Sequence, residues 1–266
     1  MLSQSKVKHW AKRIIIDAVI IYVALLGVLF FTQSNYIYYP DEQDFEECIE
    51  FTDADKITQN GTRMYVTENN NPDTLVIFYH GNAGSACDRS LWNYFFNTLD
   101  VSNIFVEYAG YSNDPRTPSE ELFYQDVQNV QEYIATLPYK RIIIVSESIG
   151  SGPATYHTTL TYVAELLLMT PFVELADVAS YHYPIYPVRL LLKDKFDNVK
   201  NLSNFTGNLT LIHGEEDEII PIHLGKQLFD EVKTQHKKFI GVPNADHDDI
   251  YVHSEVFDTL LDIILQ

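Results

Sequence analysis

The chain of 266 residues has few basic residues. Eighteen Lys and Arg residues stand against 37 Asp and Glu, which gives a formal net charge of −19 at pH 7. The first 13 positions hold four of the basic residues and no acidic one, so the rest of the chain is still more acidic. Such a body repels nucleic-acid phosphates and anionic head groups, and this argues against a nucleic-acid partner. We interpret the acidity as a source of solubility.

Cysteine is also scarce, since Cys48 and Cys87 are the only two in the chain. An oxidising compartment permits such residues to pair, but two cysteines about 40 positions apart are equally compatible with separate burial. The sequence alone therefore leaves the question of a disulfide open.

One long apolar segment lies near the N-terminus. Residues 14–31 contain a single charged residue, Asp17, and this length is at the lower end of what spans a bilayer as a helix. A cleaved signal peptide is the competing interpretation, but the run is longer than a normal signal-peptide core and lacks a small-x-small cleavage site after it. We therefore predict an uncleaved anchor over 14–32, between a basic tail at 1–13 and a tyrosine-rich linker at 33–43.

The basic tail sets the predicted orientation of this anchor. The positive flank of a membrane helix stays in the cytoplasm. The rest of the chain is then expected on the periplasmic or extracellular side of a bacterial membrane, or on the lumenal side of a eukaryotic one.

From residue 44 onward, segments with strand and helix spacing alternate. The predicted strands are 45–51, 62–66, 74–79, 103–108, 141–145, 166–169, 209–212 and 239–242, with the first two as an antiparallel pair around the Asn60-Gly61 turn. The predicted helices are 85–99, 118–137, 150–162, 222–232 and 255–265. Repeated strand–helix units predict an α/β domain over 44–266, with a mostly parallel sheet flanked by helices. The stretch 172–207 interrupts this rhythm and is interpreted as a cap-like helical insertion, with an ordinary connecting helix and loop as an equal alternative.

A serine follows the strand 141–145 in a turn of small residues. The sequence Ser146-Glu147-Ser148-Ile149-Gly150 has the shape of a nucleophile elbow, usually Gly-x-Ser-x-Gly, in which the serine is exposed on a strained strand-to-helix turn. Ser146 replaces the first glycine, at a position where small side chains avoid a collision as the chain doubles back. The pattern predicts Ser148 as a nucleophile.

A serine that attacks an acyl group needs a base, and the base needs an acid to orient it. Asp217 lies in a carboxylate-rich loop after the strand 209–212, and His247 lies in a polar loop after the last predicted strand. Ser148, Asp217 and His247 therefore follow in the chain order expected of a nucleophile-elbow fold. By spacing alone, the nearby carboxylates Glu215, Glu216 and Glu218 are also plausible acids.

The oxyanion formed in acyl transfer needs N–H donors. We predict the amide of Ile149, directly after the nucleophile, as one donor. The second is predicted in the loop after the strand 74–79, from the amide of Asn82, with that of the adjacent Ala83 as the alternative. His80 and His213 each stand at a strand end before a glycine, and we interpret both as residues that brace a loop.

Four ordered motifs resemble those of the α/β-hydrolase superfamily, namely His80-Gly81-Asn82-Ala83-Gly84, Ser148-Ile149-Gly150-Ser151-Gly152, His213-Gly214-Glu215-Glu216-Asp217 and His247-Asp248-Asp249. The chain is most similar to serine hydrolases with an N-terminal membrane anchor, which are related to protein depalmitoylases and have bacterial homologues. The segment Tyr108-Ala109-Gly110-Tyr111-Ser112 resembles that subgroup's Tyr-x-Gly-Tyr-Gly loop. The resemblance implies ester or thioester hydrolysis without a metal or an organic cofactor.

We therefore expect a membrane-anchored serine hydrolase that cleaves carboxylic esters or thioesters through an acyl-enzyme on Ser148. The anchor and the aromatic, leucine-rich insertion favour an acyl-chain or lipid-like substrate, with Tyr108, Tyr181, His182 and Tyr183 as candidate contacts. A serine peptidase and a non-catalytic binding or assembly protein of the same fold are the alternatives.

Overall fold

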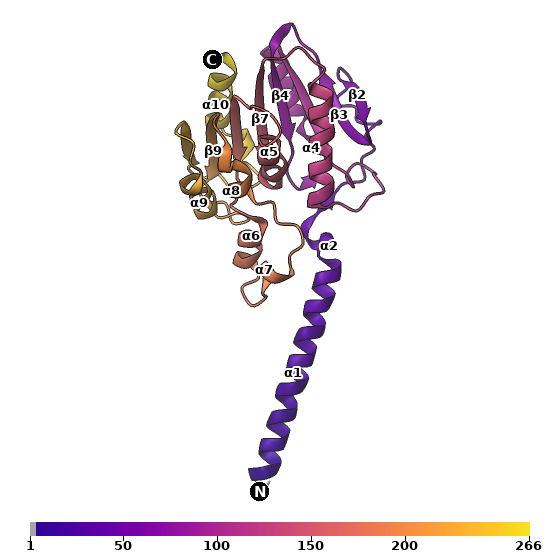
Figure 1. The fold of residues 1–266 in the computed structure, drawn as a ribbon, viewed down its shortest axis with the longest axis vertical. Coiled ribbons are helices and arrows are strands. Elements are labelled where there is room, and N and C mark those ends of the chain that lie inside the picture. Colours follow the sequence, from indigo (N-terminus) through magenta and orange to yellow (C-terminus); the bar gives the residue numbers. More distant parts are fainter. Residues whose placement is uncertain (1–3) are drawn as a thin grey trace.

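A long N-terminal helix projects from an α/β body in the computed structural model, which describes residues 4–266 (Figure 1). This helix, α1 (Gln4–Thr32), carries the N-terminal end of the chain far from the body. Its segment Lys8–Thr32 is long and apolar enough to cross a membrane. The most apolar 18 residues of this segment have a mean hydropathy of 2.8, and none of them is buried against the rest of the protein. The predicted tail 1–13 is helical from Gln4 onward, and its first three residues lie outside the described residues.

An eight-stranded sheet forms the centre of the body, in the spatial order β10-β9-β8-β7-β4-β6-β3-β2. The strands from β10 to β6 in that order are parallel, and β3 pairs antiparallel with both β6 and β2. Their bounds are β2 (Asp55–Gln59), β3 (Thr62–Thr67), β4 (Asn71–Tyr79), β6 (Val101–Glu107), β7 (Arg141–Glu147), β8 (Glu165–Met169), β9 (Asn208–Gly214) and β10 (Lys237–Val242). The fold class predicted from the sequence is thereby confirmed.

Helices cover both faces of this sheet because its central strands are apolar on both sides. Along β4 the side chains alternate between two cores. Leu75 and Ile77 pack in the core that includes α4 (Glu120–Ile134), α5 (Ser151–His157) and α9 (Ile222–Glu231). Val76 and Phe78 pack in the opposite core, with α3 (Ser90–Thr98) and α10 (Ser254–Leu265).

The start of the body differs from the sequence prediction. Residues 45–51 form turns, and the strand that pairs with β3 around Asn60 and Gly61 is β2. Phe45 and Phe51 are nevertheless buried, with ring centroids 4.5 and 4.4 Å from that of Tyr65. The apolar pattern of 45–51 therefore reports the burial of a loop on the sheet, which periodicity does not separate from a strand.

Other boundaries shift by a few residues. The predicted helix 85–99 consists of a 3₁₀ turn, η1 (Ala86–Arg89), followed by α3. Helix α4 begins at Glu120 because the Ser119 hydroxyl accepts a hydrogen bond from the N–H of Leu122 and caps the first turn. Helix α5 ends at His157, before the predicted end at residue 162.

Residues 172–207, which we call the insertion, lie between β8 and β9. The described residues of this segment form only short helices and loops, with α6 (Leu175–His182), α7 (Val188–Leu191), α8 (Asn198–Asn201) and the 3₁₀ turn η3 (Leu202–Asn204). In Figure 1, α6 and α7 lie at the end of the body from which α1 emerges.

Cys48 and Cys87 form a disulfide, with their Cα atoms 5.9 Å apart. Both residues are buried. The bond ties the turns before β2 to η1, so it joins two segments that lie outside the sheet.

Candidate active site

Ser148 is the first residue after β7 and begins the 3₁₀ turn η2 (Ser148–Gly150). Its φ of +50° lies in the left-handed region, which is uncommon for a residue with a Cβ atom and is a form of strain found at functional sites. The turn depends on Gly150, because a Cβ atom there would lie 2.4 Å from the carbonyl oxygen of Tyr79. Ser146 is fully buried, and its hydroxyl has no hydrogen-bond partner among the described residues.

His247 contacts both other members of the predicted triad. Its Nε2 lies 3.2 Å from Ser148 Oγ, and its Nδ1 lies 2.8 Å from Asp217 Oδ2. The three residues follow the carboxyl ends of β7, β9 and β10, which meet at one edge of a parallel sheet.

Of the four acidic residues in the loop after β9, Asp217 is the buried one, whereas Glu215, Glu216 and Glu218 are exposed. The structure thereby distinguishes the carboxylate next to His247 from its sequence neighbours.

Several donors surround the carboxylate of Asp217. Its Oδ1 accepts hydrogen bonds from the N–H groups of Ile219 (2.9 Å) and Ile220 (2.7 Å), and its Oδ2 lies 3.5 Å from His213 Nε2. Burial by itself would raise the pKa of Asp217, but the hydrogen bonds from His213, His247 and the Ile220 N–H outweigh it and hold the pKa well below its ordinary value. Asp217 is therefore a carboxylate, the form that orients a neighbouring imidazole and stabilises its charged state.

His213 braces this loop, as predicted from its place before a glycine. Its Nε2 donates to the carbonyl oxygen of Ile220 at 2.7 Å. The ring fits against α9 because Gly225 leaves space, since a Cβ atom there would lie 2.3 Å from His213 Nδ1. His213 thus fixes the loop that presents the acid.

The loop after β4 is held by the segment that follows α1. Strand β1 (Tyr39–Pro40) pairs in parallel with β5 (Ala83–Gly84). The Asn82 side chain donates to the carbonyl oxygen of Ile37, and its Oδ1 accepts a 2.8 Å hydrogen bond from the hydroxyl of Tyr111. These bonds fix the backbone around Asn82, whose amide stays a predicted oxyanion donor together with that of Ile149.

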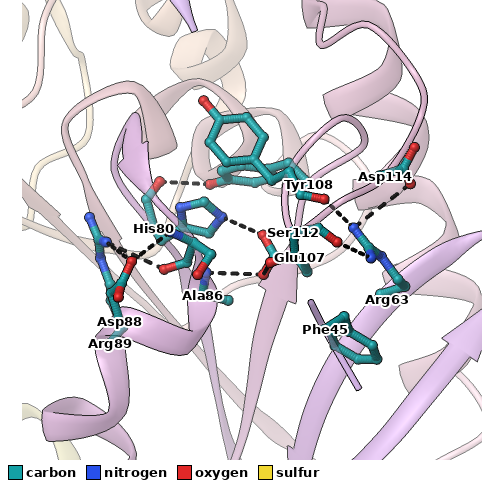
Figure 2. Close-up of polar contacts among 12 residues, drawn as sticks. Phe45, Arg63, His80, Ala86, Asp88, Arg89, Glu107, Tyr108, Ser112 and Asp114 are labelled. Atoms are coloured by element: carbon teal, nitrogen blue, oxygen red, sulfur yellow. Dashed lines mark hydrogen bonds and ion pairs between the residues drawn. The ribbon is translucent and has the colours of Figure 1, made fainter. Parts of the chain in front are cut away.

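A buried polar cluster lies behind this loop (Figure 2). His80 Nε2 is 3.3 Å from Glu107 Oε1, while Glu107 Oε2 accepts hydrogen bonds from Ser112 Oγ at 2.7 Å and from the Ala86 N–H at 3.2 Å. The Tyr108 hydroxyl donates to the carbonyl oxygen of His80 at 2.9 Å. We call His80, Ala86, Glu107, Tyr108 and Ser112 the bracing cluster, because it joins the ends of β4 and β6 to η1.

The bracing cluster overturns one predicted substrate contact. Tyr108 is fully buried, its ring stacks between His80 and Phe123 at centroid distances of 4.2 and 4.1 Å, and its hydroxyl is bonded within the cluster. The aromatic loop after β6 therefore supports the site from behind, and Tyr108 is not available to a substrate.

An apolar cavity of about 720 Å³ contains Ser148, Asn82 and Ile149 in its lining. The insertion contributes much of the remaining wall, including His182 and Tyr183, two of the predicted substrate contacts. His182 Nε2 also donates to the carbonyl oxygen of Ile219 at 2.8 Å, so it ties the insertion to the loop that bears the acid.

Tyr181 lies outside this lining, contrary to the prediction. It is 52% exposed and its ring is 6.1 Å from that of His223, on α9. Neighbouring residues of a helix point about 100° apart. The turn of α6 that directs His182 into the cavity therefore directs Tyr181 away from it.

The sequence did not predict that the N-terminal segment helps to build the cavity. Its lining includes Leu29 near the end of α1 and, from the segment after α1, Gln33, Tyr36, Ile37 and Tyr39. The tyrosines of this segment fit the pattern of an interfacial belt, and nothing in that pattern indicates that they line the same cavity as a serine more than a hundred residues away.

Comparisons with known proteins place this geometry in a family context. No protein-family model matches the chain. Uncharacterized protein Rv2307c of Mycobacterium tuberculosis is 28% identical over 249 residues, which cover 87% of this chain and 88% of that protein. Human alpha/beta hydrolase domain-containing protein 17B is 25% identical over 241 residues, covering 88% of this chain and 80% of the relative.

Among solved structures, the Pyrococcus furiosus esterase PF2001 superposes with a TM-score of 0.66 at 14% identity, over 86% of this chain and 97% of the esterase. That likeness shows the fold. The human relative found by sequence also carries the name of an alpha/beta hydrolase. The chain has the α/β-hydrolase fold and is similar in sequence to the alpha/beta hydrolase domain-containing 17B proteins.

Proposed function

We propose that the chain is a membrane-anchored serine hydrolase that cleaves carboxylic esters or thioesters through an acyl-enzyme on Ser148. The observation that carries the proposal is the continuous contact from Ser148 through His247 to Asp217 at the wall of an apolar cavity. Nucleophile, base and orienting acid within hydrogen-bond reach of one another are the signature of an activated serine.

Ser148 Oγ would attack the acyl carbon while His247 Nε2 accepts the hydroxyl proton. Asp217, held as a carboxylate, would stabilise the imidazolium through Nδ1. The amides of Ile149 and of Asn82, or of the adjacent Ala83, are proposed to bind the oxyanion, and removal of one such donor typically costs about 3 kcal/mol.

The C–O or C–S bond to the leaving group would then break, and the leaving group would take the proton from His247. Water, deprotonated by His247, would attack the acyl carbon next. The bond between the acyl carbon and Ser148 Oγ then breaks and His247 returns the proton to Oγ, which releases the carboxylic acid and restores Ser148.

The composition of the cavity favours an acyl chain over a charged peptide. Among the described residues that line it there is no Asp, Glu, Lys or Arg, and the walls are mainly Leu, Ile, Val and Tyr side chains. Its volume of about 720 Å³ also falls in the range of small-molecule sites. We therefore propose acyl-chain or lipid-like substrates.

The proposed location follows from the N-terminal helix and the disulfide. We propose a cytoplasmic tail at 1–13, an anchor at 14–32, a linker at 33–43 and a hydrolase domain at 44–266 on the far side of the membrane. The apolar helix Lys8–Thr32 and its basic start support this arrangement. The Cys48–Cys87 disulfide is of the kind that persists in oxidising compartments.

A fluorophosphonate probe tests the nucleophile directly. We expect the wild-type chain to be labelled, Ser148→Ala to be unlabelled, and Ser146→Ala, which changes a buried serine two residues away, to be labelled as well. Labelling that persists in Ser148→Ala would contradict the proposal. A series of p-nitrophenyl esters then tests the acyl preference, because higher activity on acetate than on octanoate would exclude a lipid-like substrate.

A further inference from the structure

The insertion contacts α1 well inside its apolar segment. The Tyr22 hydroxyl donates to the carbonyl oxygen of Ile185 at 2.7 Å, and the Tyr22 ring lies parallel to that of Tyr186 with centroids 6.2 Å apart. Tyr22 precedes the end of α1 at Thr32 by ten residues, or about 15 Å along the helix axis. Residues 185 and 186 therefore lie beside the middle of the segment proposed to cross the membrane.

A second set of contacts fixes the insertion to the end of α1. Gln33 Nε2 donates to the carbonyl oxygen of Leu191 at 3.1 Å, and Gln33 Oε1 accepts from the N–H of Lys193 at 2.8 Å. Lys193 Nζ lies 4.5 Å from the centroid of the Phe30 ring. The stretch 183–192, which we call the tip, is thus tied to α1 at two levels along the helix.

The tip is apolar and open on its outer side. Its only charged residue is Arg189, whose guanidinium is paired with the carboxylates of Glu174 and Asp177. Leu190 is 84% exposed and Ile185 is 72% exposed, although neither belongs to the cavity lining. Exposed apolar side chains beside an apolar helix of this length are typical of a segment that lies in a membrane interface.

We propose that the tip enters the same membrane leaflet as the C-terminal half of α1, so that lipid acyl chains cover Ile185 and Leu190. Leu29 of α1, Gln33 just after it and Leu191 of the tip line the Ser148 cavity. The cavity is then bordered by the bilayer, and its substrate is an ester or thioester whose acyl chain enters from the lipid phase. The substrate part of this inference rests on the proposed hydrolase activity, whereas the membrane contact of the tip rests only on the proposed anchor.

A fluorescence experiment on the full chain in phosphatidylcholine vesicles tests the membrane contact. Both native cysteines are in a disulfide, so Ile185→Cys provides the single free thiol for an environment-sensitive dye. Tyr162→Cys is the matched control, because Tyr162 is 67% exposed and precedes β8, at the opposite edge of the sheet from Ser148.

Nitroxide-labelled lipids should quench the dye at position 185 by at least threefold more than at position 162. Equal quenching at the two positions, or none at 185, would overturn the proposal. Because this readout does not depend on catalysis, it decides the membrane contact even if the chain proves not to be a hydrolase.

Activity measurements test the route of the substrate. We expect Ile185→Asp and Leu190→Asp to reduce hydrolysis of p-nitrophenyl palmitate embedded in the vesicles by about tenfold or more, with hydrolysis of soluble p-nitrophenyl butyrate within twofold of wild type. Tyr162→Asp should leave both activities unchanged. An unchanged rate on the embedded ester in both tip variants would overturn the lipid route, while failure of the proposed function would appear as a wild-type chain that reacts with neither ester.

Discussion

The molecule contains two groups of a serine, a histidine and a carboxylate, one beside a cavity and one sealed in the core. In the first group, His247 stands in the middle and contacts Ser148 with one ring nitrogen and Asp217 with the other. The His247 side chain is 15% exposed, and Ser148 lines the cavity. A histidine in the middle of such a group is placed to move a proton between a serine and a substrate.

The second group belongs to the bracing cluster and has the carboxylate in the middle. Glu107 contacts both Ser112 and His80, and the remaining ring nitrogen of His80, Nδ1, lies 2.7 Å from the carbonyl oxygen of Gly81. All three side chains are buried. Figure 2 shows the contacts of Glu107 with His80 and Ser112. The same residue types therefore serve different roles, and the order of contacts and access to the cavity distinguish a candidate catalytic group from a structural one.

We call Ser148, His247 and Asp217 the open group, and His80, Glu107 and Ser112 the sealed group. The largest expected effect concerns Asp217, the acid of the open group. Asp217→Asn keeps the shape of the side chain but favours the wrong orientation and tautomer of His247, so we expect kcat on p-nitrophenyl butyrate to fall by about 10⁴-fold. The exposed neighbour Glu218→Gln should retain wild-type kcat. If kcat of Asp217→Asn falls by less than tenfold while its thermal unfolding midpoint equals that of the wild type, Asp217 is not the catalytic acid.

The sequence predicts that Ser148, His247 and Asp217 converge, because of where they lie relative to the strands. Each member lies in the turn or loop that follows a strand of a parallel sheet, so their convergence at one end of the sheet follows from chain order. The sequence analysis chose Asp217, but spacing alone did not separate it from Glu215, because the two backbone N–H donors and the His213 side chain that surround Asp217 follow from the fold of one loop.

The N-terminal part of the cavity wall was beyond sequence reasoning for a similar reason, whereas His182 and Tyr183 of the insertion were predicted near a substrate and line the cavity. The hydrogen bond from Gln33 to the carbonyl oxygen of Leu191 connects two residues of the lining that are 158 positions apart, and no local periodicity encodes it. Tyr108 was misplaced because an aromatic residue at a strand end has the same pattern whether it faces a substrate or a buried histidine. The sequence thus predicts the edge of the sheet where residues meet, and packing determines which way they face.

The disulfide should support the sealed group without serving the open one. Cys87 lies in η1 next to Ala86, whose N–H donates to Glu107. Replacing both cysteines by alanine removes the constraint on a loop with a separation of 39 residues, and we expect the free energy of unfolding to fall by about 4 kcal/mol. Denaturant unfolding of the full chain in detergent measures this loss.

Activity per folded molecule should stay within about threefold of wild type in the double cysteine variant, because neither cysteine lines the cavity. A reducing agent supplies the control, since it should lower the stability of the wild type toward that of the variant and leave the variant unchanged. Wild-type stability in the variant would mean that the bond does not form in the native chain.

The next prediction breaks the sealed group at its centre. Glu107→Ala leaves the Ser112 hydroxyl and the Ala86 N–H without their buried acceptor, and we expect the free energy of unfolding to fall by about 3 kcal/mol. Glu68→Ala, at an exposed position after β3, should change it by less than about 0.5 kcal/mol. Under conditions where Glu107→Ala is folded, a loss of fluorophosphonate labelling as complete as in Ser148→Ala would show that the two groups do not differ in the way proposed.

His157 differs from both His247 and His80, because among the described residues its ring nitrogens contact a tyrosine and a glutamine and not a carboxylate. The Tyr79 hydroxyl lies 2.7 Å from His157 Nδ1, and Gln131 Oε1 lies 2.9 Å from Nε2. Burial lowers the pKa of His157 to about 3. As the pH falls below 6.5, the unfolded chain therefore takes up a proton that the native chain does not bind, and stability present above that pH is lost.

We expect this histidine to reduce the free energy of unfolding by about 2 kcal/mol between pH 6.5 and pH 5. Burial raises the pKa of Asp126 to about 6, and this carboxyl acts in the opposite direction, stabilising the native chain as the pH falls through 6. The measurement is therefore the difference between the wild type and His157→Gln at the two pH values. A difference that does not change with pH would contradict a neutral His157.

The smallest expected effect concerns Ser146, the residue that departs from the usual elbow sequence. Its hydroxyl is buried and has no hydrogen-bond partner among the described residues, so its desolvation is uncompensated. Ser146→Ala removes the hydroxyl and keeps the Cβ atom, and we expect the chain to gain up to about 1 kcal/mol in the free energy of unfolding with kcat within twofold of wild type. Thermal unfolding together with the p-nitrophenyl butyrate assay measures both quantities. A tenfold change in kcat without a change in stability would instead mean that the Ser146 hydroxyl acts on the geometry of Ser148. Ser146 would then belong to the open group as a positioning residue on β7.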